Sequence, residues 1–211
     1  MSLYAENKGG GFTLTPSGSH LGVCYRIIDL GTQKVEYMGT SKFQHKVMFA
    51  WELHITDDDG RAVRMDDDRP FSIFKNYTLS WSDKATLRQD LQSWRGKPFT
   101  QEELNRFDLK NVLGAWGMVN VIERQGQNGK TYANVSGITP VPSIIRQQGL
   151  PQRINKLELF TLSNPDIEMF STFSDNLKAK IQASPEWQKR NATLPQSEVV
   201  VNDLGDDEIP F

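Results

Sequence analysis

The chain has 211 residues, of which 37% are hydrophobic and 24% charged, and its formal net charge is −2. This composition predicts one folded domain of ordinary size and excludes a chain that is disordered throughout. The single cysteine, Cys24, excludes an internal disulfide framework and fits a reducing compartment. No apolar run approaches the roughly 18 residues that span a bilayer, and the first residues lack the apolar core of a signal peptide. We therefore expect a cytoplasmic protein without a membrane partner, in which Cys24 is buried and unreactive.

The charges are unevenly distributed along the chain. Residues 196–211 contain five of the 26 acidic residues and neither lysine nor arginine. The remaining 21 acidic residues are opposed by 24 basic ones, so the body carries +3 and the tail −5. A basic body with an acidic tail is typical of proteins whose body binds a polyanion.

Three strands are predicted in the first part of the chain, after a glycine-rich segment at 1–19 that we expect to be a flexible arm. Apolar residues at 20–33 predict the first strand, and a strict alternation at 44–56 predicts the second. The third strand is predicted at 70–81, where Phe74 and Lys75 interrupt the alternation, which indicates a bulge or an edge that faces a ligand. In the second strand the expected buried residues are Val47, Phe49, Trp51, Leu53 and Ile55, and the opposite face holds Lys46, Met48, Glu52 and His54.

Helical segments and a hairpin follow these strands. Ser82 is predicted to cap a helix over 83–94, in which Leu87, Leu91 and Trp94 share one face. A capping box then opens a second, short helix. The box lies at 100–103, further helical turns are expected at 108–114, and two antiparallel strands are expected at 115–124 and 131–141.

The order of these elements predicts the fold. Five strands with a helical insert between the third and the fourth are typical of the OB-fold, an antiparallel barrel that binds oligonucleotides. We therefore predict a mainly β protein with an OB-fold-like five-stranded barrel as the DNA-binding domain over 20–142. An extension over 143–190, with a short strand at 156–162 and a helix at 174–183, is expected to pack on the barrel. Residues 191–211 are expected to form a disordered acidic tail.

No set of residues typical of catalysis is found. The acids Asp57–Asp59 and Asp66–Asp68 are adjacent, whereas a calcium loop requires alternating acids, and we interpret them as solvated turn residues. His20, His45 and His54 lack the spacing of metal ligands. P-loop and nucleophile-elbow motifs are absent. We therefore expect no enzymatic activity, no metal and no cofactor.

Cations and aromatic rings are interleaved along the predicted barrel. Binding of single-stranded DNA requires both, because cations neutralise phosphates and flat rings stack on unpaired bases. The alternative interpretation is that the rings lie in the core and the cations are solvated. For Trp51 and Trp81 we expect a position in the core. Phe74 and Tyr132 share a strand face with polar neighbours, which favours a contact with DNA. The candidate nucleic-acid-binding residues are Arg26, Tyr37, Lys42, Phe43, Lys46, Phe74, Lys75, Tyr77, Arg124, Lys130 and Tyr132.

The last six residues, DDEIPF, resemble the C-terminal tip of bacterial single-stranded DNA-binding proteins. In that family the tip recruits replication, recombination and repair enzymes, whose pockets hold the phenylalanine ring and the terminal carboxylate. The resemblance implies that Phe211 is the anchor and that Ile209 and Pro210 are read by their shape. It also implies that acidic side chains guide the tip to its partner. These acids are Asp206, Asp207 and Glu208.

The body resembles phage-encoded single-stranded DNA-binding proteins over about residues 20–140. The segments that carry the resemblance are YRIIDLGTQ, FSIFKNYTLS, LRQDLQSWRGKPFT, FDLKNVLG and KTYANVSGI. It implies sequence-independent binding and protection of single-stranded DNA during replication or recombination, in the cytoplasm of a bacterial host. RNA binding and a recombination-mediator role are variants of this hypothesis. The second hypothesis is an interaction protein that uses the tail as a decoy for host pockets and binds no nucleic acid. Neither resemblance determines the oligomeric state.

Overall fold

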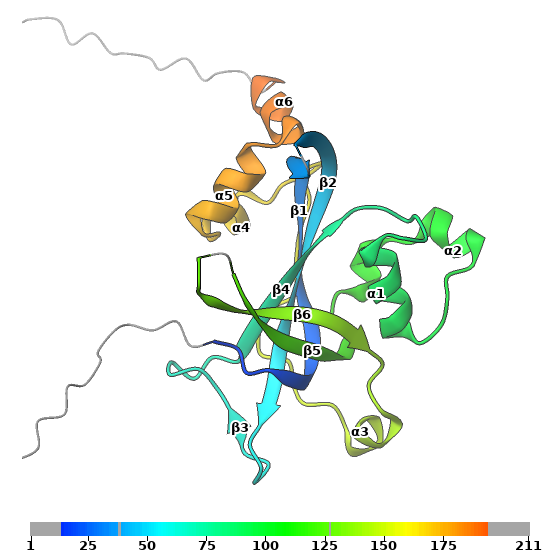
Figure 1. The fold of residues 1–211 in the computed structure, drawn as a ribbon, viewed down its shortest axis with the longest axis vertical. Coiled ribbons are helices and arrows are strands. Elements are labelled where there is room, and N and C mark those ends of the chain that lie inside the picture. The colour runs from blue at the N-terminus through cyan, green and yellow to red at the C-terminus, as the bar shows by residue number, and fades with distance from the viewer. Residues whose placement is uncertain (1–13, 38, 127, 194–211) are drawn as a thin grey trace, which may run out of the picture.

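The structure is a computed structural model, and it describes residues 14–37, 39–126 and 128–193. Within these residues the protein is mainly β, with a strongly bent sheet and helices placed around it (Figure 1). The tail residues 206–211 and most of the expected N-terminal arm lie outside the described residues. The last helix ends at Thr193, inside the segment that was expected to be disordered from residue 191 onward.

The sheet contains the five strands predicted for the barrel, a short strand within the predicted 156–162, and one further short strand that was not predicted, β3. Neighbouring strands run in the order β3-β2-β1-β5-β6, while β4 pairs with the free edge of β2 and β7 pairs with β1. All pairs are antiparallel except β7 with β1, which is parallel. The bounds are β1 Gly18–Tyr37, β2 Thr40–Thr56, β3 Ala62–Val63, β4 Phe71–Thr78, β5 Trp116–Gln125, β6 Thr131–Thr139 and β7 Glu158–Phe160.

The sheet curls toward closure but is not a closed barrel. Strands β4 and β6 lie close together, yet within the described residues they are not paired by strand hydrogen bonds. The curvature comes partly from two irregularities in β1, between Cys24 and Arg26 and between Asp29 and Gly31. Gly31 has a φ of 68°, and a Cβ at this position would lie 2.5 Å from the Cβ of Ser184, so only glycine fits the bend.

Three helical segments, α1, α2 and the 3-10 helix η1, follow β4 and precede β5. The predicted capping box is confirmed, because the Thr100 hydroxyl accepts from the Glu103 N–H and the Glu103 carboxylate accepts from the Thr100 N–H. The predicted cap at Ser82 is wrong: the chain first makes a turn, in which the Ala85 N–H donates to the Ser82 carbonyl, and α1 begins after Ala85. The bounds are α1 Thr86–Arg95, α2 Gln101–Arg106 and η1 Leu109–Val112.

Four more helices belong to the C-terminal extension, of which the sequence predicted only α5. Helix α3 lies near β3 at one end of the molecule, and α4, α5 and α6 cluster at the other end beside the β1–β2 hairpin (Figure 1). No helix in the described part of the chain is long and apolar enough to cross a membrane. The bounds are α3 Ser143–Gln148, α4 Ile167–Ser171, α5 Asp175–Gln182 and α6 Pro185–Thr193.

Two apolar cores lie on opposite faces of the β1–β2 ribbon. The first fills the concave face beneath α1 and includes Trp51, Leu87 and Trp94, together with Cys24, whose thiol is buried as predicted. The second joins the convex face to the extension. Its members are Ile28, Leu30, Met48, Phe160, Leu162, Phe170, Phe173, Ile181 and Trp187.

The second core corrects the prediction for the convex face of β2. Met48 and Glu52 were expected on a polar face, but both are buried, because the extension covers that side of the ribbon. Helix α6 is fixed there by Glu186, whose carboxylate accepts hydrogen bonds from the backbone N–H and the hydroxyl of Thr32 at 2.9 and 2.6 Å.

Candidate nucleic-acid interface

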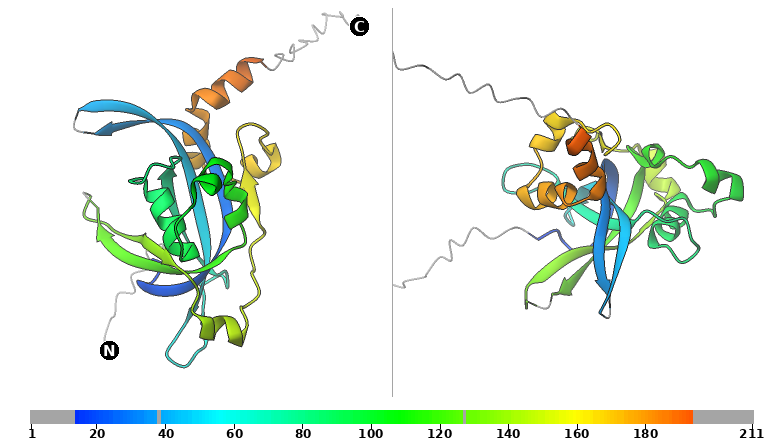
Figure 2. Two further views of the ribbon diagram at one scale, coloured as in Figure 1. Left: turned by 90° about the vertical axis from the view of Figure 1, so that its right-hand side faces the viewer. Right: turned by 90° about the horizontal axis from the view of Figure 1, so that it is seen from above.

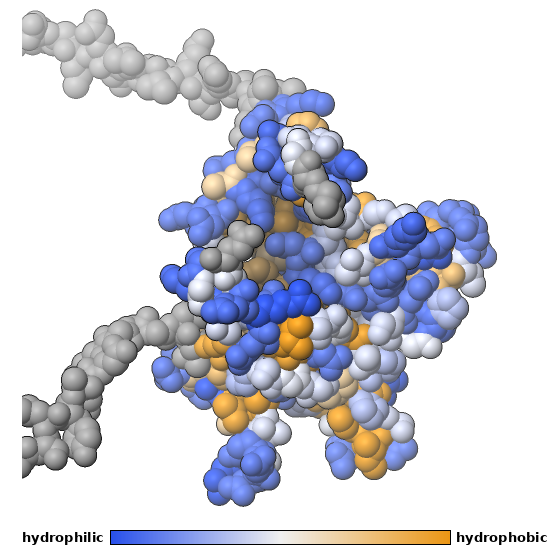
Figure 3. Space-filling view, viewed as in Figure 1, coloured by the Kyte–Doolittle hydropathy of each residue, from blue (hydrophilic) through white to orange (hydrophobic). Residues whose placement is uncertain are grey.

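An open groove lies between two projecting hairpins. The ends of the β1–β2 and β5–β6 hairpins project to the same side of the molecule, as the left panel of Figure 2 shows. Between them the surface in Figure 3 is hollowed, with hydrophilic side chains around a more hydrophobic floor. A cavity of about 410 Å³ opens where β4 meets β5 and β6. Its lining residues are Phe74, Lys75, Asn76, Ile122, Arg124, Asn134, Val135 and Ser136. We call this surface the cleft.

Strand alternation places the aromatic and polar side chains of the cleft on the convex face. On β4, Ile73 and Tyr77 point into the first core, so Phe74 and Asn76 between them point outward. The ring of Phe74 is 63% exposed, which is unusual for a large apolar side chain on a strand. On the opposite side, Arg124 of β5 pairs in register with Tyr132 of β6, which is 45% exposed.

Lys75 and Tyr77 point to the concave face, where Asp90 of α1 holds both. The Lys75 ammonium lies 2.6 Å from the Asp90 carboxylate, and the Tyr77 hydroxyl donates to the same oxygen at 2.8 Å. Tyr77 is 2% exposed, and burial, together with the Asp90 charge, raises the pKa of its hydroxyl. Tyr77 is therefore a core residue whose ring has no free face for a base. Lys75 lines the cavity, but its charge is already paired.

Lys46 and Lys180 form a cationic pair beside the cleft. The Lys46 ammonium donates to the side-chain oxygens of Gln44 and Thr78, both at 2.7 Å, and neither acceptor carries a charge. Burial, and the charge of Lys180 on α5, lower the pKa of Lys46. Within the described residues, no carboxylate forms an ion pair with either lysine. Two unneutralised cations of this kind provide a place for a phosphate.

The other predicted residues of the cleft lie on the two hairpins. Phe43, on the β1–β2 hairpin, is 70% exposed, and Lys42 precedes it. Tyr37 is the last residue of β1, and its side chain lies outside the described part of the structure. Lys130 lies in the β5–β6 turn, next to Asn128, whose side-chain amide donates to the Tyr132 hydroxyl at 2.7 Å.

Arg26 does not lie in the cleft. Its guanidinium forms an ion pair with Glu158 of β7 and lies 5.8 Å from the centre of the Phe173 ring, so it is part of the contact between β1 and the extension. Sequence reasoning also missed five lining residues of the cleft, among them Asn76 and Asn134, and it missed Lys180 beside the cleft. Asn76 lies two residues from Phe74 and Asn134 two residues from Tyr132, so strand alternation alone places each asparagine on the same face as the ring. No local sequence pattern indicates that Lys180 lies beside the cleft.

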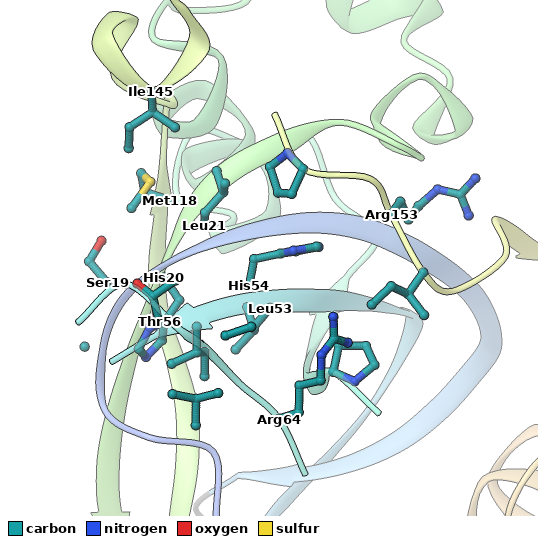
Figure 4. A pocket seen from close by; sticks show the side chains of 18 of the residues that line it. Ser19, His20, Leu21, Leu53, His54, Thr56, Arg64, Met118, Ile145 and Arg153 are labelled. Carbon is teal, nitrogen blue, oxygen red and sulfur yellow. The ribbon is translucent and has the colours of Figure 1, made fainter. Parts of the chain in front are cut away.

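A larger cavity, of about 1180 Å³, lies at the other end of the molecule between β3, α3 and the convex face (Figure 4). Its two histidines already have partners: His20 contacts the Pro16 carbonyl and His54 contacts the Glu52 carboxylate, both at 2.8 Å. The aspartates at 57–59 and 66–68 are exposed turn residues, and three of them form ion pairs with arginines: Asp59 with Arg61, Asp67 with Arg69 and Asp68 with Arg64. No group of three or more His, Cys, Asp or Glu side chains in the described residues is placed to hold a metal. The described lining residues of this cavity include Arg64 and Arg153 but no exposed large aromatic side chain on which a base could stack.

No protein-family model matches the chain, and neither the curated proteins nor the solved structures gave a match. The case for a function therefore depends on the side chains of the cleft. The cleft contains the exposed ring of Phe74 and the cation Arg124, and beside it lie the exposed ring of Tyr132 and the cationic pair of Lys46 and Lys180.

Proposed function

We propose that the protein binds single-stranded DNA in the cleft without sequence preference. The observation that carries the proposal is the exposure of Phe74, which lines the cavity together with Arg124, and of Tyr132, the cross-strand neighbour of Arg124. The Tyr132 hydroxyl is bonded to Asn128, but nearly half of this residue and most of Phe74 remain exposed. The exposed part of each ring offers a stacking surface for an unpaired base, while the cations hold the phosphates.

The arrangement of the strands supports the proposal. We infer that β1, β2, β4, β5 and β6 form an incomplete OB-fold barrel, in which α1, α2 and η1 are the helical insert. In that fold the face of the second and third strands, together with the loops on either side, binds oligonucleotides. The corresponding surface here is the outer face of β4 and the part of β2 near Lys46 that the extension leaves uncovered, flanked by the β1–β2 and β5–β6 hairpins.

The lack of preference for a DNA sequence follows from the kind of side chain that faces the groove. An aromatic ring stacks on any base, since every base has a π-face. Side-chain amides such as those of Asn76 and Asn134 both donate and accept hydrogen bonds, so they adapt to different base edges. We expect a site of about 4–16 nucleotides per protomer, the usual range for one OB-fold.

The acidic tail completes the proposed function. We propose that residues 206–211 recruit replication, recombination or repair enzymes to the bound DNA, as their resemblance to the bacterial tip implies. These residues lie outside the described part of the structure. Their acidic run and the Ile-Pro-Phe sequence are the features that a basic, apolar pocket on a partner would recognise.

A titration of fluorescence anisotropy tests the proposal. Full-length protein is added to a labelled oligo-dT, to a mixed-sequence single strand, to RNA and to a duplex of equal length. We expect tight binding to both DNA single strands and much weaker binding to the duplex. Equal affinity for the duplex would overturn the assignment to single strands. The absence of any binding at low salt would favour the alternative, a decoy that uses only the tail.

A further inference from the structure

A strip of exposed apolar side chains runs along the face opposite the cleft. The segment between β6 and α4 passes behind the sheet in Figure 1, and in the left panel of Figure 2 it follows the edge away from the two hairpin ends. Most of the large apolar side chains that the described residues expose lie on this segment or at the first residue of α4. They are Ile144, Leu150, Ile154, Leu157, Leu159 and Ile167, with exposed fractions from 38% to 59%. Exposed apolar side chains gathered along one segment are typical of a surface that another protein covers.

The middle of the strip is a strand with a free edge. Strand β7 pairs with β1 on one side, and no strand in the described part of the chain pairs with its other side. An open edge leaves backbone N–H and C=O groups in position for another strand, and natural proteins usually protect such edges with charges, proline or a cover. Two exposed leucines, Leu157 and Leu159, lie at this edge instead.

The sequence around the edge is complementary to itself. Lys156 and Glu158 flank Leu157, so antiparallel pairing of the segment with a second copy about Leu157 would place each Lys156 opposite the Glu158 of the other chain. Within the described residues Lys156 forms no ion pair. Glu158 is paired with Arg26 on its own chain, and its side chain remains 24% exposed, which leaves an oxygen for a second cation.

We propose that this strip is the interface of a homodimer, in which residues Lys156–Glu158, at the start of β7, pair antiparallel with the same residues of the partner about a two-fold axis at Leu157. In a dimer with a two-fold axis both protomers use the same surface patch, so the patch must be complementary to itself. The Lys156–Leu157–Glu158 sequence is complementary to itself in this way. The continuous sheet then crosses the interface, and the exposed side chains of the strip are buried. The two clefts lie on the outer sides of the dimer, facing away from each other, where one DNA strand can occupy both.

The oligomeric state of the full-length protein tests this interface independently of DNA binding. Sedimentation velocity over a range of concentrations is expected to show a dimer for the natural sequence. Leu157→Lys places two ammonium groups at the axis and is expected to raise the dissociation constant of the dimer at least about tenfold. Lys156→Glu is expected to weaken the dimer, because it sets a second carboxylate against Glu158 across the interface. Lys84→Glu makes the same change of charge on an exposed loop and is expected to have no effect.

Cross-linking tests the position of the axis. The chain has one cysteine, Cys24, and it is fully buried, so a cysteine introduced elsewhere is the only accessible thiol. Residues opposite each other at a two-fold axis lie close enough for a disulfide. Leu157→Cys is therefore expected to give a covalent dimer on mild oxidation, whereas Ser136→Cys, in the cleft, is not. A natural protein that remains monomeric at all concentrations would overturn the proposal. So would a Leu157→Lys variant that dimerises as well as the natural protein.

Discussion

The carboxylate of Glu52, which is fully buried on β2, accepts hydrogen bonds from both the backbone N–H and the side-chain amide of Asn155, at 2.6 and 2.7 Å. The Ile154 N–H donates to the same carboxylate at 2.9 Å, and the His54 ring contacts it at 2.8 Å. These bonds attach the segment before β7 to the sheet, more than a hundred residues away in the sequence. Glu52 thus holds the apolar strip in place.

The stability of the protein should depend on this buried carboxylate. Glu52→Gln leaves backbone donors of Ile154 and Asn155 facing an amide, and is expected to reduce the free energy of unfolding by about 1–3 kcal/mol at neutral pH. Urea unfolding measures the change. Glu102→Gln, an exposed carboxylate on α2, is the matched control and is expected to change stability little. Equal stability of the two variants would show that the attachment contributes nothing.

The contribution of Glu52 should also depend on pH. Burial raises the pKa of this carboxyl, but the hydrogen bonds from Asn155, Ile154 and His54 outweigh burial and hold the pKa below its usual value. A carboxyl whose pKa is lower in the folded state stabilises the fold above its unfolded pKa, about 4.3, and loses that contribution as the pH falls through the folded pKa. Unfolding curves from neutral pH down through this range should therefore converge for the natural protein and Glu52→Gln. Parallel curves would contradict the assignment.

The exposed rings of the cleft should affect DNA binding and leave the fold unchanged. Phe74→Ala and Tyr132→Ala are each expected to weaken binding to oligo-dT by about 1–3 kcal/mol, the usual value of a base–aromatic stack. Tyr77→Phe is the control: it removes the hydroxyl that donates to Asp90 and should lower stability by about 1 kcal/mol without changing affinity. Thermal unfolding and anisotropy on the same samples separate the two effects. If the alanine variants unfold while their folded fraction binds normally, the rings belong to the core.

The cationic pair should determine part of the salt dependence. Lys46→Ala and Lys180→Ala are each expected to reduce the slope of log affinity against log salt by about 0.7, the value for one phosphate contact on a single strand. Lys75→Ala should have a smaller effect, because Asp90 already neutralises that charge. Titrations at several salt concentrations give the slopes. An unchanged slope for Lys180→Ala would restrict the DNA site to the sheet and exclude α5 from it.

Deletion of residues 203–211 should leave the fold intact and make DNA binding tighter at low ionic strength. An acidic segment tethered to a +3 body competes with phosphate for the same cations at high effective concentration. The gain should fade at physiological salt, where charges are screened beyond about 8 Å. The truncated protein should also lose its capture of replication and repair enzymes, and Phe211→Ala should lose that capture with little change in DNA affinity. Weaker DNA binding with unchanged partners would assign the tail to the DNA site.

Sequence periodicity predicted the concave face of the sheet but not the convex one. Phe49, Trp51 and Leu53 are buried as the alternation of the second strand predicted, because their partners lie on adjacent strands with the same period. Met48 and Glu52 are buried by residues that follow more than a hundred positions later, and no local pattern carries that information. The same long-range packing explains why α4 and α6 were not predicted.

The candidate site was predictable to a similar extent. The interrupted alternation of the third strand drew attention to Phe74, and its ring is exposed. For Tyr77 and Arg26 the residue type alone led to a wrong prediction of a DNA contact. The Tyr77 hydroxyl is hydrogen-bonded to Asp90, and the Arg26 guanidinium forms an ion pair with Glu158. A sequence shows that a cation or a ring is present; only the fold shows whether its charge or its face is already used.

The two cores share one ribbon, and this arrangement affects synthesis of the protein. On the ribosome β1 and β2 emerge early, and their concave face can be covered as soon as α1, β5 and β6 follow. Their convex face, with Ile28, Leu30 and Met48, stays bare until Phe160 and Trp187 have also been made. A chain that stops after β6 would therefore expose an apolar surface on an otherwise folded sheet, a form that aggregates and is held by chaperones. The extension is thus needed for solubility during synthesis as well as for the finished fold.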